Sequence, residues 1–313
     1  MQSAAIVGAG LIGRAWANVF ARAGWNVRMW DPDTGQRADA ALLVAQSLRE
    51  LAAYGLVSDP DAAAKRVSVV TTLEEAVAGA EYVQECGPEV LDVKRATFEH
   101  LDRAAPPHAI LASSTSAIVA SKFTEGLAGR ARCLVAHPVN PPHLVPVVEL
   151  CGAPWTSAQT LRRAREILEG VGQVPIEVKR EIDGFILNRL QVALLTEAFR
   201  LVQEGYVSPE DLDHTIADGL GLRWAFMGPF ETIELNAPGG VEDYCRRYVP
   251  WFRRYMGSLP PASVWDDAQW QAAAAAWNHA PTPGEIAAKS LWRDQRLAAL
   301  VAHKRAQKPH ESD

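Results

Sequence analysis

The first half of the chain alternates short apolar runs with longer segments that have apolar residues at helical spacing. Glycine or polar residues follow the short runs, as is typical of buried strands. The predicted strands are 4–7, 26–31, 67–72, 82–87, 109–115, 133–139, 147–152 and 174–179. The predicted helices are 14–23, 36–54 and 156–171. Strands that alternate with helices predict a doubly wound, mainly parallel sheet of the α/β class.

The pattern changes after Gly184. The segment 185–204 predicts a long, strongly apolar helix, and no convincing strand follows it. Ser208 precedes Pro209 and two acidic residues, which is typical of a helix start. We therefore expect two domains: residues 1–183 with the sheet, and residues 184–313 as an all-helical domain.

Composition and charge narrow the function. The net charge is −6, and basic residues cluster only in a short tail near Lys304 and Arg305, so we expect neither nucleic acid nor a membrane surface as a partner. No apolar run reaches the ~18 residues of a membrane-spanning helix. The four cysteines lack CxxC spacing, which indicates reduced thiols and no metal site. No leader-like segment precedes the first strand, so we expect a cytoplasmic protein.

A glycine-rich motif, "GAGLIG", lies between the first strand and the first helix. Gly8 allows a tight turn, Gly10 allows the backbone to approach a diphosphate, and Gly13 allows the helix to pack on the strand. Leu11 and Ile12 complete the loop, and the helix N-terminus faces the phosphates. Because of this context, we predict a Rossmann-type dinucleotide site rather than a glycine-rich turn without a ligand.

Asp31 ends the second strand, where a carboxylate accepts hydrogen bonds from a ribose 2′-hydroxyl and repels a 2′-phosphate. This favours NAD over NADP. The alternative is that Asp31 is a turn residue before Pro32.

The stretch "CLVAHPVNPPHLVPVVEL" contains a histidine and a glutamate in strand-like surroundings. His137 follows the run "CLVA" at the carboxyl end of its strand, where ligands bind in open α/β sheets. The prolines that follow interrupt the sheet, so the chain turns, and its return can bring Glu149 beside His137. The pair is either an acid–base pair or a structural contact near the surface.

Two further polar residues lie at positions suited to a site. Ser116 follows the strand 109–115, and Asn188 lies within the apolar helix of "DGFILNRLQVALL". A buried amide needs a hydrogen-bond partner. For each of the two residues taken singly, a structural role with its hydrogen bonds satisfied in the core is as good an explanation as a role in the site.

Taken together, these residues resemble the 3-hydroxyacyl-CoA dehydrogenase family over roughly residues 3 to 240. The matching motifs are "GAGLIG", "SSTSAI", "HPVNPP" followed by "VEL", and "GFILNRL". "AHPVNPPHLVPVVEL", "EGYVSPEDLD" and "GLGLRWAFMGPFETIELNA" resemble most the branch of lambda-crystallin and L-gulonate 3-dehydrogenase.

The resemblance implies a NAD-dependent dehydrogenase with a small-molecule substrate, and a homodimer formed through the helical domain. Six of the ten tryptophans lie beyond Gly184, which agrees with more apolar surface than a monomeric domain needs. The resemblance also implies a set of site residues. The catalytic residues would be Ser116, His137, Glu149 and Asn188, and the cofactor would contact Glu89, Lys94 and Asn140.

Two features differ from the members of the family that use CoA. The segment 34–56 contains only Arg37 and Arg49 as cations, although CoA phosphates need basic partners. The family's "GKGFY"-type ending is absent, and a charged helix from Trp292 to Lys308 is expected instead. Arg223 is a candidate to bind a substrate carboxylate in a bidentate manner, or else it is a surface residue.

Three functions therefore remain open. The first is oxidation of the 3-hydroxyl of a small, L-gulonate-like hydroxy acid. The second is oxidation of another alcohol, either carnitine, with Trp224, Phe226 and Phe230 as an aromatic cage, or a 3-hydroxyacyl-CoA. The third, of another class, is a crystallin-like structural protein that binds NAD without catalysis.

Overall fold

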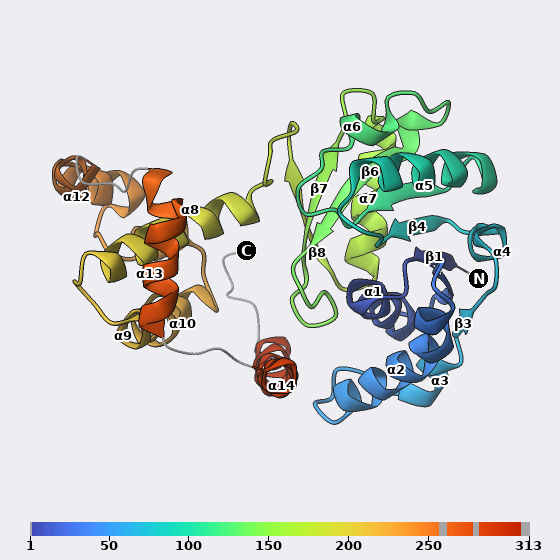
Figure 1. Cartoon of the computed structure of the whole chain (residues 1–313), viewed down its shortest axis with the longest axis horizontal. Helices are drawn as coiled ribbons and strands as arrows, with labels where there is room; N and C mark the ends of the chain where they lie inside the picture. The colour runs from blue at the N-terminus through green and yellow to red at the C-terminus, as the bar shows by residue number, and fades with distance from the viewer. Residues whose placement is uncertain (1, 257–261, 278–281, 308–313) are drawn as a thin grey trace. The chain divides into compact units, whose positions relative to one another are not determined.

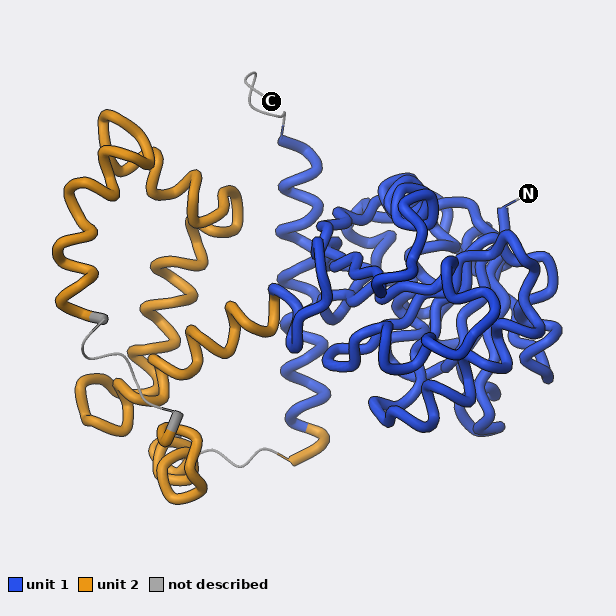
Figure 2. The backbone as a smooth tube through the Cα atoms, turned by 90° about the horizontal axis from the view of Figure 1, so that it is seen from above, with its two compact units in different colours: residues 1–186, 285–313 blue, residues 187–284 orange. Residues whose placement is uncertain are grey.

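The computed structural model describes residues 2–256, 262–277 and 282–307. It divides the chain into two compact units (Figure 2). Unit 1 comprises Met1–Ile186 together with Glu285–Asp313, and unit 2 comprises Leu187–Gly284.

One sheet of eight strands forms the centre of unit 1 (Figure 1). The strand order is β3-β2-β1-β4-β5-β6-β7-β8. All neighbouring strands are parallel except β6 and β7, which are antiparallel. The strands are β1 (Ser3–Val7), β2 (Asn26–Trp30), β3 (Val67–Val69), β4 (Tyr82–Glu85), β5 (Ile110–Ser113), β6 (Cys133–Pro138), β7 (Val147–Gly152) and β8 (Val174–Val178). Every strand predicted from the sequence is present, although β3 is shorter than predicted.

Helices cover both faces of this sheet, as expected for a doubly wound Rossmann-type fold. Those of unit 1 are α1 (Leu11–Arg22), α2 (Thr34–Ala52), α3 (Pro60–Ala64), α4 (Leu73–Val77), α5 (Leu91–Ala104), α6 (Ser121–Thr124), η1 (Arg130–Arg132), α7 (Ala158–Gly170) and α14 (Pro283–Ala306). Local chemistry starts several of them: the side chains of Asp33, Thr72 and Ser157 cap α2, α4 and α7.

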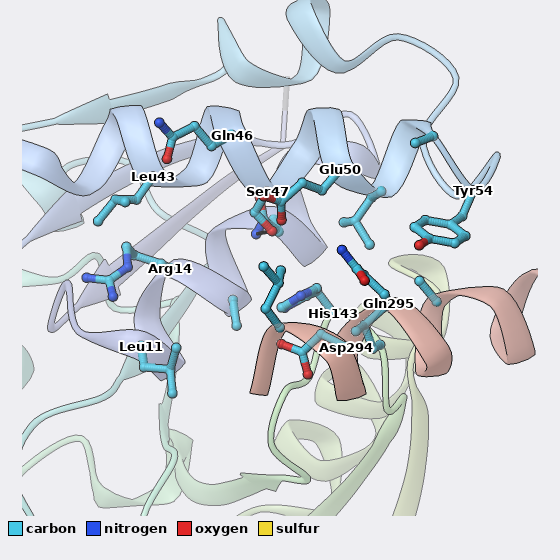
Figure 3. Close-up of a pocket in the computed structure, with 17 residues that line it drawn as sticks. Leu11, Arg14, Leu43, Gln46, Ser47, Glu50, Tyr54, His143, Asp294 and Gln295 are labelled. Atoms are coloured by element: carbon cyan, nitrogen blue, oxygen red, sulfur yellow. Dashed lines mark hydrogen bonds between the residues drawn. The ribbon is translucent and has the colours of Figure 1, made fainter. Parts of the chain in front are cut away.

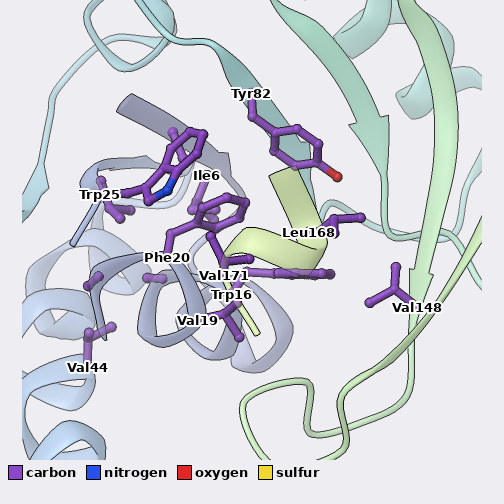
Figure 4. Close-up of a cluster of buried hydrophobic side chains, with 14 of the residues drawn as sticks. Ile6, Trp16, Val19, Phe20, Trp25, Val44, Tyr82, Val148, Leu168 and Val171 are labelled. Atoms are coloured by element: carbon purple, nitrogen blue, oxygen red, sulfur yellow. The ribbon is translucent and has the colours of Figure 1, made fainter. Parts of the chain in front are cut away.

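The sheet separates two apolar cores, because successive side chains of a strand point to opposite faces. In β1, Ala4 and Ile6 belong to one core, whereas Ala5 and Val7 belong to the other. The first core packs α1, α2 and α7 against the sheet (Figure 4), and α14 adds Ala298 to it. Phe20 lies at its centre, with its ring centroid 5.3 Å from that of Trp25 and 5.4 Å from that of Tyr82.

Unit 2 is helical, with no strand among its described residues. Its elements are α8 (Leu187–Gln203), α9 (Pro209–His214), η2 (Thr215–Leu220), α10 (Gly221–Trp224), α11 (Pro229–Glu234), α12 (Gly240–Met256), η3 (Ala262–Trp265) and α13 (Asp267–Trp277). Phe199 of α8 packs on Trp265 of η3 with ring centroids 4.9 Å apart. None of the described helices is long and apolar enough to cross a membrane.

The compact units differ from the predicted division at residues 183 and 184. The chain enters unit 2 after Ile186, and α14 groups with unit 1 rather than with the helical region. The reason is an apolar stripe on α14: Ala298 is buried in the first core, and Leu297 and Val301 pack beside it. Lys308, the predicted end of this helix, lies outside the described residues.

The glycine loop generates a prediction about stability. A Cβ added at Gly13 would lie 1.8 Å from the carbonyl oxygen of Gly8, which is backbone and cannot give way. Gly13→Ala should therefore lower the free energy of unfolding by about 3 kcal/mol or more, measured by denaturant unfolding. Gly10→Ala is the matched control, because its Cβ would meet nothing within 4 Å. Equal stability of the two variants would contradict the close packing of α1 on β1.

Candidate active site

The glycine loop presents the start of α1 to an anion. Gly8 has φ 110°, and a Cβ there would lie 2.7 Å from the carbonyl oxygen of Cys86. Gly10 is the N-cap of α1, and neither a capping side chain nor an acidic residue occupies the first turn. The first amide groups and the positive end of the helix dipole therefore suit the diphosphate of a dinucleotide. The chemistry of this loop fits NAD.

Asp31 follows β2 and is tied to the same loop. One carboxylate oxygen accepts a hydrogen bond from the Ala9 amide at 2.7 Å, and the other accepts one from the Asp33 amide at 2.8 Å. Arg37 donates to the backbone carbonyl of Asp31 at 2.5 Å. The carboxylate is only half-buried, so it combines a role in loop structure with access to a ligand. That it binds the ribose stays a prediction.

Glu89 holds the turn that contains Ser116. Its carboxylate accepts hydrogen bonds from the Thr115 hydroxyl and from the amides of Ser116 at 3.2 Å, Ile118 at 3.3 Å and Ala117 at 3.4 Å. Burial by itself raises the pKa of Glu89, but these hydrogen bonds outweigh burial, and the net effect lowers it. The turn therefore depends on an ionised glutamate, and it presents Ser116 at the carboxyl end of β5.

Lys94 is buried in an ion pair. Its ammonium lies 3.0 and 3.1 Å from the two carboxylate oxygens of Glu85, and both side chains are 1% exposed. Glu85 also accepts hydrogen bonds from the Ser113 hydroxyl at 2.5 Å and from the Gly87 amide at 2.7 Å. The ammonium of Lys94 is thus already bound by protein groups. Its predicted place along the cofactor stays a prediction.

His137 and Glu149 face each other across the antiparallel pair β6–β7. They are register partners, and Nδ1 of His137 lies 2.7 Å from Oε2 of Glu149. Both are buried, with exposed fractions of 5% and 0%. The other carboxylate oxygen, Oε1, accepts a hydrogen bond from the Ile186 amide at 2.8 Å. The ring of Phe185 packs on the imidazole, with centroids 5.4 Å apart. The carboxylate fixes the orientation of the imidazole, an arrangement that suits proton transfer at Nε2.

The remaining predicted residues are spread over both units. Ser116 and Asn140 are exposed in the segments that follow β5 and β6, at the same carboxyl edge of the sheet as His137. Asn188 is half-buried in the first turn of α8, and Arg223 is exposed in α10. Unit 1 thus brings together His137 with Glu149, Glu89 with Ser116, and the glycine loop with Asp31. That Asn188 and Arg223 join the same site stays a prediction.

Sequence reasoning missed several polar residues that support the site. Gln84 donates to the Ser114 hydroxyl at 2.7 Å and to the carbonyl of Ala136, next to His137, at 3.3 Å. The indole of Trp16 in α1 also donates to Ser114, at 3.1 Å. The sequence did contain a signal for this network, because two polar residues, glutamine and glutamate, end the otherwise apolar strand "YVQE", which is buried throughout. Buried polar side chains need partners, which joins the helix of the glycine loop to the strand of His137.

A cavity of about 470 Å³ lies elsewhere in unit 1, between α1, α2 and α14 (Figure 3). Leu11 lines it, but His137 and Glu149 do not. His143, the second histidine of the proline-rich segment, lines this cavity. Burial, with a smaller contribution from the charge of Arg22, lowers the pKa of His143 to about 4. The imidazole of His143 therefore stays uncharged down to acidic pH, and its place in this cavity keeps it apart from the pair of His137 and Glu149.

Comparisons with known proteins agree with this geometry. Residues 3–182 match the NAD binding domain of 3-hydroxyacyl-CoA dehydrogenase, and residues 184–262 match its C-terminal domain. A lambda-crystallin homolog of Bos taurus is 45% identical over 302 residues, which are 95% of this chain and 94% of that protein. An L-carnitine dehydrogenase of Streptomyces coelicolor is 39% identical over 251 residues, which are 80% of this chain and 78% of that protein.

A solved structure with the same fold is that of a 5-formyl-3-hydroxy-2-methylpyridine 4-carboxylic acid 5-dehydrogenase. Its TM-score is 0.84 at 24% identity, and the match covers 98% of this chain and 100% of that one. The matched domains, the identity to the curated relatives and the glycine loop all indicate the same family. The chain belongs to the 3-hydroxyacyl-CoA dehydrogenase family, with NAD as its cofactor.

Proposed function

We propose that this protein oxidises the 3-hydroxyl group of a small, L-gulonate-like hydroxy acid to a 3-oxo acid. The observation that carries the proposal is the buried contact of 2.7 Å between His137 and Glu149 at the carboxyl edge of the sheet. A histidine held this way is suited to take a proton from an alcohol. When bound, NAD would supply the hydride acceptor for the carbon that bears this hydroxyl group.

In the proposed mechanism, His137 is the general base. Neutral imidazole keeps its Nδ1 proton, which it shares with Glu149 in a hydrogen bond, and accepts the hydroxyl proton of the substrate at Nε2. The carboxylate of Glu149 then stabilises the imidazolium through the same short contact. Ser116 and Asn188 bind the reacting oxygen, and in the reverse direction His137 returns the proton. General-base assistance of this kind is worth about 10²–10⁴ in rate.

The proposed substrate is a free acid rather than an acyl-CoA. The helix α2 contains no lysine. Its two arginines already have protein partners: Arg37 binds the carbonyl of Asp31, and Arg49 lies 3.2 Å from Asp61. We propose Arg223 as the group that binds the substrate carboxylate, since guanidinium and carboxylate pair in a bidentate manner.

Carnitine is a second candidate substrate. Three curated relatives are 36–39% identical to this chain. Two are named L-carnitine dehydrogenase, and the third is named L-carnitine dehydrogenase/betainyl-CoA thioesterase. Trp224, Phe226 and Phe230 of unit 2 are exposed, and aromatic faces attract quaternary ammonium groups. A non-catalytic, crystallin-like role is the candidate of another class.

We also propose a cytoplasmic homodimer formed through unit 2. Its described residues expose many large apolar side chains, among them Leu190 at 66% and Phe230 at 75%. An exposed apolar surface of this kind is typical of an interface, and a second copy of the chain would cover it. The four cysteines are free thiols, which suits a reducing compartment.

The function is tested by the formation of NADH with L-gulonate, L-carnitine and a 3-hydroxyacyl-CoA, in the wild type and in His137→Gln. Turnover should be highest with the hydroxy acid, and His137→Gln should lower kcat by about 10²–10⁴ while NAD still binds. His143→Gln is the control, because that histidine lies in the proline-rich segment that follows β6, outside the pair. Survival of kcat within a factor of a few in His137→Gln would refute the general-base role, and no turnover of any alcohol would favour the structural role.

Cofactor choice tests Asp31 separately. A 2′-phosphate would meet the carboxylate of Asp31, so NADP should be a poor cofactor for the wild type. Asp31→Ser should narrow the ratio of kcat/KM with NAD to kcat/KM with NADP. A wild-type protein that uses both cofactors equally well would show that Asp31 does not face the ribose.

Substrate recognition tests Arg223. A bidentate, charge-assisted pair contributes roughly 1.5–3 kcal/mol, or about 10- to 150-fold in affinity. Lysine keeps the charge but cannot form the two parallel hydrogen bonds of a guanidinium. Arg223→Lys should therefore raise KM for the acid, and Arg223→Met should raise it further. NAD affinity should not change. An ester or amide of the same acid is the control, and an equal rise in KM for these uncharged compounds would mean that Arg223 only shapes its helix.

A further inference from the structure

The segment Gly184–Ile186, which leads from unit 1 into unit 2, contains an unusual backbone conformation. Gly184 has φ 77°, and Phe185 has φ 47°. Among the described residues, Phe185 is the only one other than glycine with positive φ. A bulky side chain is disfavoured in this region, whereas glycine adopts it freely. The phenylalanine side chain must therefore supply something that outweighs the strain.

The side chain of Phe185 contacts the candidate general base. Its ring is fully buried, with an exposed fraction of 0%, and belongs to the second core. The ring centroid lies 5.4 Å from that of His137, with 35° between the two planes. An apolar wall on one side of the imidazole excludes water there and limits how the ring can turn.

The next residue contacts the partner of His137. The amide of Ile186 donates to Oε1 of Glu149 at 2.8 Å, while Oε2 of the same carboxylate engages His137 at 2.7 Å. A carboxylate with one oxygen tied to a backbone amide cannot rotate without losing that hydrogen bond. The two adjacent residues of the segment thus restrain both members of the pair. The left-handed conformation at Phe185 directs its ring to the imidazole while the following amide faces the carboxylate.

We propose that the 184–186 segment positions the general base, with the Phe185 ring fixing the plane of His137 and the Ile186 amide fixing the carboxylate of Glu149. The proposal rests on the role of His137 proposed above. Positioning matters for rate, because a displacement of about 1 Å can cost about 10²-fold. Since α8 begins at Leu187, the segment that holds the base is also the one that leads into unit 2.

The test compares Phe185→Leu with Phe123→Leu. Phe123 belongs to the same core, is 3% exposed, and packs on Phe98 with centroids 4.6 Å apart. Both variants lose a buried ring, so their melting temperatures should fall by similar amounts. Only Phe185→Leu should lower kcat, by about 10-fold or more, with KM for NAD unchanged. Only this variant should also shift or broaden the Nδ1–H resonance of His137 in the NMR spectrum of ¹⁵N-labelled protein.

A second pair of variants covers the case in which Phe185→Leu does not fold. Gly184→Ala and Gly172→Ala introduce a Cβ at φ 77° and φ 80°, so their conformational penalties match. Only Gly184 adjoins the residues that touch the pair. We expect a loss of kcat and an altered His137 resonance in Gly184→Ala alone.

The outcomes separate this proposal from the proposed function. Equal kcat and an unchanged resonance in all four variants would overturn the positioning role, even if His137→Gln is inactive. Full activity of His137→Gln would instead refute the general-base role. The His137 resonance would then decide by itself whether the segment positions the pair.

Discussion

A buried carboxylate opposite a buried imidazole is the constraint on which the arrangement of unit 1 depends. Removing an ionised carboxylate from water costs several kcal/mol unless each of its oxygens finds a donor. Glu149 meets this requirement from two directions, through His137 on β6 and through the amide of Ile186. The first contact is made across the antiparallel pair of β6 and β7, in which the two residues are register partners, and the second is made where the chain passes the sheet before unit 2 begins. The strand pair at which the sheet reverses direction and the segment that leads into unit 2 thus both contact one side chain.

Glu85 is a second buried carboxylate, and its charge is compensated by an ion pair rather than by a histidine. Glu85 is neutralised by Lys94 and receives two further hydrogen bonds, so its charge is fully compensated inside the sheet. The charge of Lys94 also lowers the pKa of neighbouring Glu89, although less than the hydrogen bonds from Thr115 and Ser116 do. One fully buried ion pair therefore supports the exposed Glu89, which in turn holds the turn with Ser116. The polar side chains become more exposed toward the carboxyl edge of the sheet, where a ligand has to enter.

Much of this could be predicted because it is local. Apolar runs predicted the strands, and the position of "GAGLIG" between a strand and a helix predicted the dinucleotide loop. The prolines after His137 predicted that the chain would turn, which brought Glu149 within reach. Interactions between distant segments could not be predicted. The apolar stripe on α14 can pack on any core, and nothing local assigns it to unit 1. Likewise, the left-handed conformation of Phe185 was hidden, because the preceding Gly184 alone accounts for a turn.

The packing of α14 on the first core has a consequence for synthesis on the ribosome. Unit 1 begins with the first strand but is completed by a helix that ends at Ala306, after all of unit 2 has been made. Until then, the surface that Leu297, Ala298 and Val301 cover remains open to solvent. Domains usually fold in the order in which they emerge, and exposed apolar surface promotes aggregation. Here the first unit to begin folding is the last to be finished, so the nascent chain carries an uncovered apolar face while all of unit 2 is being made.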